Sequence, residues 1–204
     1  MNEKEIQKEI RSLTGVRKLL TEKMGEEKTA AVFADCEQRM RKAWNMYENA
    51  SKEEAFHLKK IIPRACIYNS IKEQDKDLAL DVILQDHREK AEGIARHLKR
   101  IMKLPGMKNI FMKAWDPLTK KMFGEKAGFK NVFYENGRNE YRMDIIQCPY
   151  CRVFSELGAP ELAKYSCESD DIVYGDLPGI DFIRTQTLAT GGTKCDFYLK
   201  LTDK

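Results

Sequence analysis

The sequence has no run of about 20 apolar residues, the length that a helix needs to cross a membrane. Its first residues, MNEKEIQKEI, also lack the apolar segment of a secretory signal. We therefore expect a soluble cytoplasmic protein with no membrane partner. In that reducing compartment, the six cysteines are expected to be free, metal-bound or catalytic rather than joined in structural disulfides.

Histidine is scarce, and its spacing excludes a zincin-type metal site. His57, His87 and His97 are never four residues apart with a glutamate between them.

The charge is uneven, since residues 1–139 carry 29 basic and 21 acidic residues and residues 140–204 carry 7 and 11. The basic residues are interleaved with acidic ones, which is typical of solvated helices. With no zinc-finger spacing and no stripe of aromatic and basic residues, we expect no nucleic-acid partner.

The first half of the chain is predicted to be helical. Ser51 and Glu54 have the spacing of a capping box, so a helix is expected to start there, and Pro63 is expected to kink or restart it. Cys36 and Cys66 lie in apolar helical stretches and are predicted to be small buried side chains. Residues 27–49 show one apolar helix face, with residues three and four apart: Phe33, Cys36, Met40, Trp44 and Tyr47.

The pattern changes after a stretch of prolines and glycines over residues 105–130, where we expect a transition. Residues 132–134 and 141–145 predict a β-hairpin, whose Asn136-Gly137 is typical of a type I′ turn. A second hairpin is predicted from residues 182–188 and 195–201.

Helices are expected over about 151–157 and 160–175, between the two hairpins. The fold class is therefore α+β, with a helical N-terminal half packed with a C-terminal antiparallel sheet. Residues 1–110 form the helical region and residues 111–204 the α+β domain, or the two are one continuous domain.

Four cysteines lie close together in the last third of the chain: Cys148, Cys151, Cys167 and Cys195. Four thiolates match the ligand count of a structural zinc site or an iron–sulfur cluster, so a non-enzymatic metal- or ligand-binding domain is an alternative function. Cys148-Pro149-Tyr150-Cys151 before a helix also resembles the glutaredoxin active site, which predicts an acidic thiol at Cys148. The short, helix-rich remainder of the chain does not match that fold, so redox catalysis ranks third.

A broader resemblance covers roughly residues 130–200. It is carried by Cys148-Pro149-Tyr150, by the step from Cys167 to Asp170, and by Arg184-Thr185-Gln186-Thr187-Leu188-Ala189-Thr190-Gly191-Gly192 with Cys195-Asp196-Phe197. These segments are similar to the L-2-amino-thiazoline-4-carboxylic acid hydrolase family. The resemblance implies hydrolysis of a cyclic isothiourea amino acid to N-carbamoyl-cysteine, and a small-molecule substrate.

The residues fit this chemistry. Cys167 is the expected nucleophile, and Asp170, one helical turn later, is the expected base for water or partner of the amidine nitrogen. The Arg184 fork suits a substrate carboxylate. Cys195 and Asp196 complete the catalytic candidates, although only one of these two adjacent strand residues can face the pocket.

Substrate binding is expected from Arg184, Thr187, Gly191 and Gly192, with backbone N–H groups of the Gly191-Gly192 turn stabilising the tetrahedral intermediate. This leading interpretation requires no cofactor, whereas the alternative requires zinc or an iron–sulfur cluster at the four cysteines. The oligomeric state is left open, and a homo-oligomer is compatible with the sequence.

Overall fold

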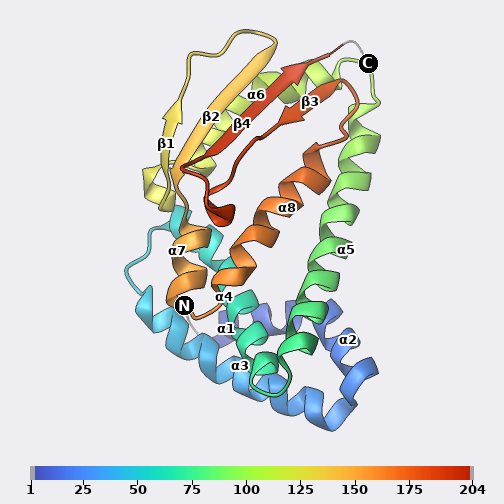
Figure 1. Cartoon of the computed structure of the whole chain (residues 1–204), viewed down its shortest axis with the longest axis vertical. Coiled ribbons are helices and arrows are strands. Elements are labelled where there is room, and N and C mark those ends of the chain that lie inside the picture. Colours follow the sequence, from blue (N-terminus) through green and yellow to red (C-terminus); the bar gives the residue numbers. More distant parts are fainter. Residues whose placement is uncertain (1–2, 203–204) are drawn as a thin grey trace. The chain divides into compact units, whose positions relative to one another are not determined.

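The computed structural model describes residues 3–202 (Figure 1). Helices dominate the first half and a four-stranded sheet the C-terminal part, as the α+β prediction requires. The helices are α1 (Glu3–Ser12), α2 (Thr14–Met24), α3 (Glu26–Met46), α4 (Lys52–Lys72), α5 (Lys76–Met102), α6 (Met107–Met122), α7 (Pro149–Glu156) and α8 (Ala163–Tyr174). The strands are β1 (Lys130–Phe133), β2 (Glu140–Gln147), β3 (Ile180–Ile183) and β4 (Cys195–Leu201).

The chain forms two compact units. The helical unit contains the chain up to His87 together with Arg152–Leu162, and the sheet unit contains Arg88–Cys151 and the chain from Ala163 onward. The boundaries thus fall within α5, within α7 and directly before α8. The domain division expected near residue 110 stays a prediction.

In the helical unit, the predicted apolar stripe is buried from Phe33 to Trp44, whereas Tyr47 lies just past the end of α3 and is half-buried. Cys36 and Cys66 are both buried free thiols. The Ser51 hydroxyl accepts a hydrogen bond from the Glu54 N–H at 3.0 Å, so the predicted cap is confirmed. The predicted restart at Pro63 is wrong, because α4 runs on as one helix to Lys72. Burial of the α4 residues on both sides of this proline outweighs the loss of one backbone hydrogen bond.

Segment 152–162 is held in the helical unit by polar contacts to α4. Arg152 pairs with Glu54 at 2.8 Å, and the Asn69 amide donates to the Leu157 carbonyl at 2.7 Å. Burial disfavours the charge on Glu161, but hydrogen bonds from Lys72 and Tyr68 outweigh it and hold the pKa of this carboxyl at about 2.

In the sheet unit, two hairpins are present and are joined side by side, but the first strand of the second is Ile180–Ile183 rather than residues 182–188, and Leu188 begins a short 3-10 helix instead. The strand order is β1-β2-β4-β3, with every neighbouring pair antiparallel. The central pair runs from Glu140 opposite Lys200 to Ile145 opposite Cys195. Strand β4 therefore pairs with β3 of its own hairpin and with β2 of the other, and its first residue sits at the end of the β2–β4 ladder.

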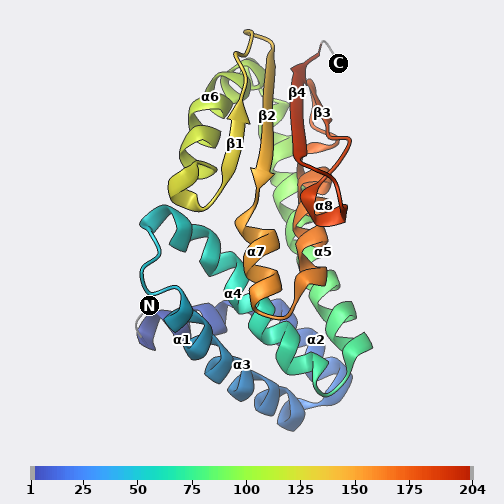
Figure 2. The ribbon, with the colours of Figure 1, turned by 60° about the vertical axis from the view of Figure 1, so that its left-hand side comes forward.

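The two faces of this sheet differ sharply. Tyr141, Met143 and Leu199 point into a core that is completed by residues of α6, the C-terminal end of α5 and the end of α8, and Figure 2 shows these helices on one side of the sheet. Arg142 is exposed on the opposite face, where its guanidinium lies over the Tyr198 ring at 5.2 Å. Alternation along β2 and β4 thus separates a helix-covered face from an open polar face.

Two local predictions differ from the structure. Gly137 does not have a positive φ, and no non-glycine residue among those described does, so Asn136-Gly137 is not a type I′ turn. The Asn136 side chain instead accepts the Arg142 N–H at 2.6 Å within a longer loop. Residues 107–122 form a full helix with Pro117 inside it, where the prolines and glycines predicted a transition.

The buried position of Leu199 in the central strand yields a first prediction. Its side chain is fully buried, so Leu199→Ala should lower the free energy of unfolding by about 2–5 kcal/mol through lost contacts and a cavity. The neighbouring Lys200 is exposed on the other face, and Lys200→Ala should change stability by about 0.5 kcal/mol or less. Urea unfolding of both variants checks this, and equal losses would contradict the assigned faces.

Candidate active site

The four cysteines of the last third come together in the sheet unit as two hydrogen-bonded thiol pairs. Cys148 immediately precedes α7 and pairs with Cys151 in its first turn, while Cys167 on α8 pairs with Cys195 at the start of β4. A charge on Cys167 raises the pKa of Cys151, and a charge on Cys151 raises that of Cys195, so the two pairs are neighbours. The sequence cluster is therefore a cluster in space.

Within the second pair, the negative charge belongs on Cys195. The hydrogen bond from Cys167 lowers the pKa of the Cys195 thiol; burial opposes this, but the Leu188 N–H, 3.3 Å from Sγ, and the Arg184 charge add to the lowering. The hydrogen bond to Cys195 and burial raise the pKa of Cys167 far above its ordinary value, and the Asp170 charge acts in the same direction. Of this pair, Cys167 is therefore the thiol that keeps its proton more firmly.

Arg184 lies at the centre of this arrangement with its side chain only 3% exposed. Its guanidinium donates to Asp170 at 3.1 Å, to Asp171 at 2.7 Å and to the Cys167 carbonyl at 2.9 Å. All three partners are on α8, so Arg184 fastens this helix to the end of β3. The donor groups expected to bind a substrate carboxylate are occupied by residues of the chain itself.

Asp196 lies on the sheet face opposite Cys195, as the alternation of strand residues requires. Its carboxylate accepts the backbone N–H groups of Thr185 and Gln186, both at 2.9 Å. Burial disfavours its charge, yet these bonds and the Thr185 hydroxyl hold the pKa of Asp196 below its usual range. Asp196 thus fixes the backbone that leads to Leu188, whose N–H contacts the Cys195 sulfur.

The turn before β4 does not present the free N–H groups that the sequence analysis expected. The N–H groups of Thr190 and Gly192 are donated to the Thr187 carbonyl at 3.2 and 2.9 Å, and that of Gly191 to the Leu188 carbonyl at 3.4 Å. The Thr193 N–H is donated to the Gln186 side chain at 3.0 Å. This segment is a closed turn, in which Gly191 has the positive φ of 88° that favours glycine.

The first thiol pair is polarised in the opposite sense from the sequence prediction. The hydrogen bond to Cys151 and burial raise the pKa of Cys148 well above its ordinary value, whereas the same hydrogen bond lowers the pKa of Cys151. The acidic thiol expected at Cys148 is therefore at Cys151, which lies inside the first turn of the helix.

The alternative metal site is not formed by the cysteine cluster as it stands. Among residues 3–202, no group of three or more histidine, cysteine, aspartate or glutamate side chains is arranged to hold a metal ion. All six cysteines are free thiols.

A row of aromatic rings beside Arg184 was not anticipated from the sequence. Phe182 and Phe197 lie with their ring centroids 5.6 and 5.4 Å from the guanidinium carbon. Tyr174 continues the row at 5.8 Å from Phe182, and Trp115 at 5.2 Å from Tyr174. These residues are scattered along the chain, so only the fold brings them together to exclude water from the buried charge.

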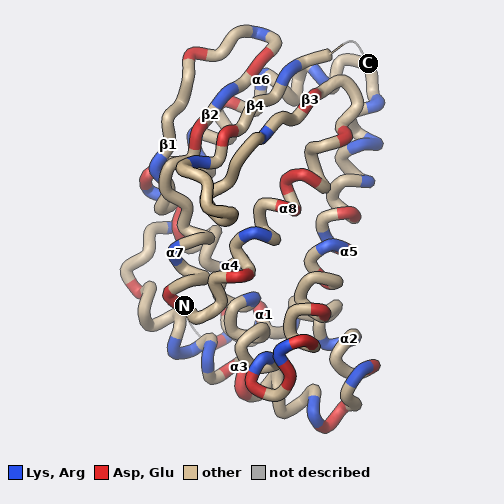
Figure 3. Tube along the Cα trace, viewed as in Figure 1, with Lys and Arg blue, Asp and Glu red and all other residues tan. Residues whose placement is uncertain are grey.

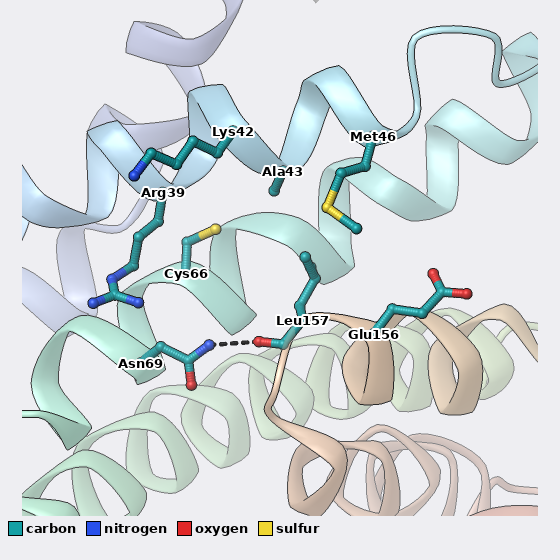
Figure 4. Close-up of a pocket in the computed structure, with 8 residues that line it drawn as sticks. All are labelled: Arg39, Lys42, Ala43, Met46, Cys66, Asn69, Glu156 and Leu157. Carbon is teal, nitrogen blue, oxygen red and sulfur yellow. Dashed lines mark hydrogen bonds between the residues drawn. The ribbon is translucent and has the colours of Figure 1, made fainter.

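A separate hollow of about 240 Å³ lies in the helical unit (Figure 4). Burial raises the pKa of Cys66 in it to about 12, so this thiol is not a reactive one. None of the predicted site residues belongs to the hollow, which is lined by Arg39, Lys42, Ala43, Met46, Cys66, Asn69, Glu156 and Leu157. The chemistry of the chain is therefore concentrated in the sheet unit.

Comparison with known proteins identifies the family. The family model described as L-2-amino-thiazoline-4-carboxylic acid hydrolase matches residues 59–199. Because this match covers most of the chain, the protein belongs to that family. The match includes α4 from residue 59 onward and all of α5, as well as the segment whose residues carried the resemblance. No curated protein and no solved structure matches the chain.

The buried guanidinium supports a prediction about stability. Arg184→Gln leaves the Cys167 carbonyl and two carboxylates without their cation, and should lower the free energy of unfolding by about 1–3 kcal/mol. This is less than for a fully buried pair, because Asp170 and Asp171 are 35% and 57% exposed. Thermal or urea unfolding measures the change.

Arg152→Gln is the matched control, since Arg152 also pairs with two carboxylates but its side chain is 35% exposed. We expect a loss of about 1 kcal/mol or less. An Arg184 variant no less stable than this control would show that the buried contacts do not hold α8.

Proposed function

We propose that the chain hydrolyses 2-amino-thiazoline-4-carboxylate, or a similar cyclic amidine acid, with Cys195 as the nucleophile. Membership of the hydrolase family supports the reaction class. The single observation that carries the assignment is the Cys195 sulfur, which accepts the Leu188 N–H beside the buried Arg184 and the protonated Cys167. Together these groups stabilise a thiolate next to a proton donor.

The first step opens the ring. The Cys195 thiolate forms a bond to the ring carbon that lies between nitrogen and sulfur, and the bond from that carbon to the ring sulfur breaks. The electron pair leaves with the ring sulfur, which takes the proton from Cys167. The result is an isothiourea linked through sulfur to Cys195, a free thiol on the substrate and a thiolate on Cys167.

The second step releases the product. Water adds across the carbon–nitrogen double bond: its oxygen bonds to carbon, and Asp170 relays one of the water protons to nitrogen. The tetrahedral intermediate then expels the Cys195 thiolate while its hydroxyl proton returns to Cys167, and N-carbamoyl-cysteine is formed. One water is consumed and both thiols regain their starting protonation states.

Arg184 and Asp196 act as positioning residues in this proposal. Arg184 holds Asp170 and the Cys167 backbone and lowers the pKa of Cys195 by its charge. Asp196 orders the backbone that leads to the Leu188 N–H. The Thr187 carbonyl accepts the N–H groups of Thr190 and Gly192, so Thr187 shapes the same backbone.

Replacing the paired thiols one at a time tests the proposal. Cys195→Ala removes the nucleophile, and kcat/KM should fall by about a thousandfold or more; Cys167→Ala removes the proton donor, and it should fall by about 10²–10⁴-fold. The assay incubates the purified chain with 2-amino-thiazoline-4-carboxylate and follows the new thiol and the mass gain of one water.

Cys66→Ala is the control, because this thiol is buried in the helical unit, whereas the cluster belongs to the sheet unit. It should keep activity close to that of the unaltered chain. Full turnover by Cys195→Ala would remove the nucleophile assignment, and a wild-type chain inert toward cyclic amidine acids would remove the proposed function.

The thiol pair also gives a pH dependence. Alkylation by iodoacetamide requires the thiolate, so the rate at Cys195 should rise with pH and reach half its maximum below the 9.0 of an ordinary thiol. In Cys167→Ala the hydrogen bond that most lowers this pKa is lost, and the midpoint should move to higher pH. Mass spectrometry of digested protein locates the label, and an unshifted midpoint would contradict the thiol–thiolate pair.

A further inference from the structure

Helix α6 is apolar on two opposite faces. Its inner face, which includes Met112 and Trp115, packs into the core of the sheet unit. Its outer face carries Ile110, Ala114 and Leu118 at four-residue steps, and these side chains form one stripe along the helix. Ile110 is 57% and Leu118 48% exposed, so the outer stripe is not part of the core. Figure 2 shows α6 at the side of the sheet, with one flank turned away from it.

Lysines border this stripe. Lys113 and Lys121 are exposed on the outer surface of α6, and neither forms an ion pair within the described part of the chain. The turn that precedes α6 adds the exposed Lys103 and Leu104, the latter 58% exposed. Figure 3 marks further lysine and arginine positions along the C-terminal part of α5.

The segment has an extreme charge for this protein. Between Ile94 and Lys121 the sequence holds eight lysines or arginines and a single acidic residue, Asp116. Asp116 is itself bound by Lys120 at 2.8 Å. Elsewhere in the first half, basic residues are interleaved with acidic ones, so this segment is a concentrated exception along the sequence, although Lys99 within it pairs with Asp176.

We propose that the outer face of α6, with the preceding turn at Lys103-Leu104, docks on an anionic lipid bilayer. Ile110, Leu118 and Leu104 enter the boundary between headgroups and acyl chains. The flanking lysines reach the lipid phosphates with their charged ends while their methylene stems lie along the apolar stripe. No helix among residues 3–202 can cross a membrane, and docking in the interface plane requires none. The proposal replaces the expectation that the chain has no membrane partner.

Charge decides between the occupants of such a surface. A second copy of α6 would bring lysines against lysines, which repel, whereas anionic headgroups complement them. A nucleic acid would also attract the lysines, but its phosphates give no favourable contact to exposed Ile110 and Leu118. Lysine and apolar side chains share one face of α6. A bilayer interface offers phosphates to the lysines and acyl chains to the apolar side chains.

The test is flotation of the full chain with vesicles. Vesicles of equal parts phosphatidylcholine and phosphatidylglycerol should bind it, vesicles of phosphatidylcholine alone should not, and added salt should release it. Lys113→Gln with Lys121→Gln should weaken binding by roughly 25-fold, about fivefold for each lysine. Ile110→Ser with Leu118→Ser should weaken it at least as much, because the apolar contribution is lost.

Matched controls come from the helical unit, where Lys8 and Lys28 are exposed and Met46 is 60% exposed. Lys8→Gln with Lys28→Gln, and Met46→Ser, should bind vesicles as the unaltered chain does. Circular dichroism and hydrolase activity of every variant establish that it is folded.

Three results would overturn the proposal. One is no binding to phosphatidylglycerol vesicles at low salt. Another is binding that survives Ile110→Ser with Leu118→Ser and is competed by duplex DNA, which would indicate a site for polyanions in general. The third is a lipid-free dimer in sedimentation that dissociates in the same variant, which would mean that a second copy covers the α6 face.

Discussion

The buried charge of Arg184 is the constraint on which the site depends. A guanidinium removed from water must have partners for its donors, and in this chain those partners are two carboxylates and one carbonyl of α8. The requirement fixes α8 against the end of β3. Because Cys167 is on the same helical turn as these partners, the requirement also fixes the position of its thiol relative to Cys195. One buried cation therefore sets both the tertiary contact and the electrostatics of the thiol pair.

Strand β4 divides the site between the two faces of the sheet. Asp196, on the polar face, binds the backbone of Thr185 and Gln186, while Cys195, on the helix-covered face, receives the N–H of Leu188 from the same stretch. The carboxylate thus orders the segment without touching the sulfur. Adjacent residues that look like one catalytic dyad in the sequence have different physical tasks, and only the alternation of strand side chains distinguishes them.

Regular periodicity was sufficient for much of the fold. The apolar stripe of α3, the Ser51 cap and both hairpins follow from local patterns that packing reinforces. The four-cysteine cluster was also visible, because its members lie within about fifty residues of one another. The resemblance seen over residues 130–200 proved to be part of a longer family match that begins in α4.

The details of the site were not accessible in the same way. Whether a turn presents its N–H groups or closes on them depends on the conformation of residues 187–193, and both outcomes fit the same Gly-Gly sequence. Which thiol of a pair carries the charge depends on a single backbone N–H and on a cation that is distant in sequence. Such hydrogen bonds and charge interactions arise only when the fold brings separated segments together.

Helix α6 shows a further limit of pattern reading, and its cause bears on how the protein meets its surroundings. Pro117 and the nearby glycines predict an irregular transition, but burial of Met112 and Trp115 holds the segment in a helix. Once it is helical, the intervening Ile110, Ala114 and Leu118 necessarily share the opposite face, among lysines. If the segment is predicted to be irregular, this stripe cannot be predicted, because exposed apolar residues form a surface only when a regular structure places them side by side. The same packing that completes the core of the sheet unit therefore creates an outward surface whose composition suits an interface rather than bulk water.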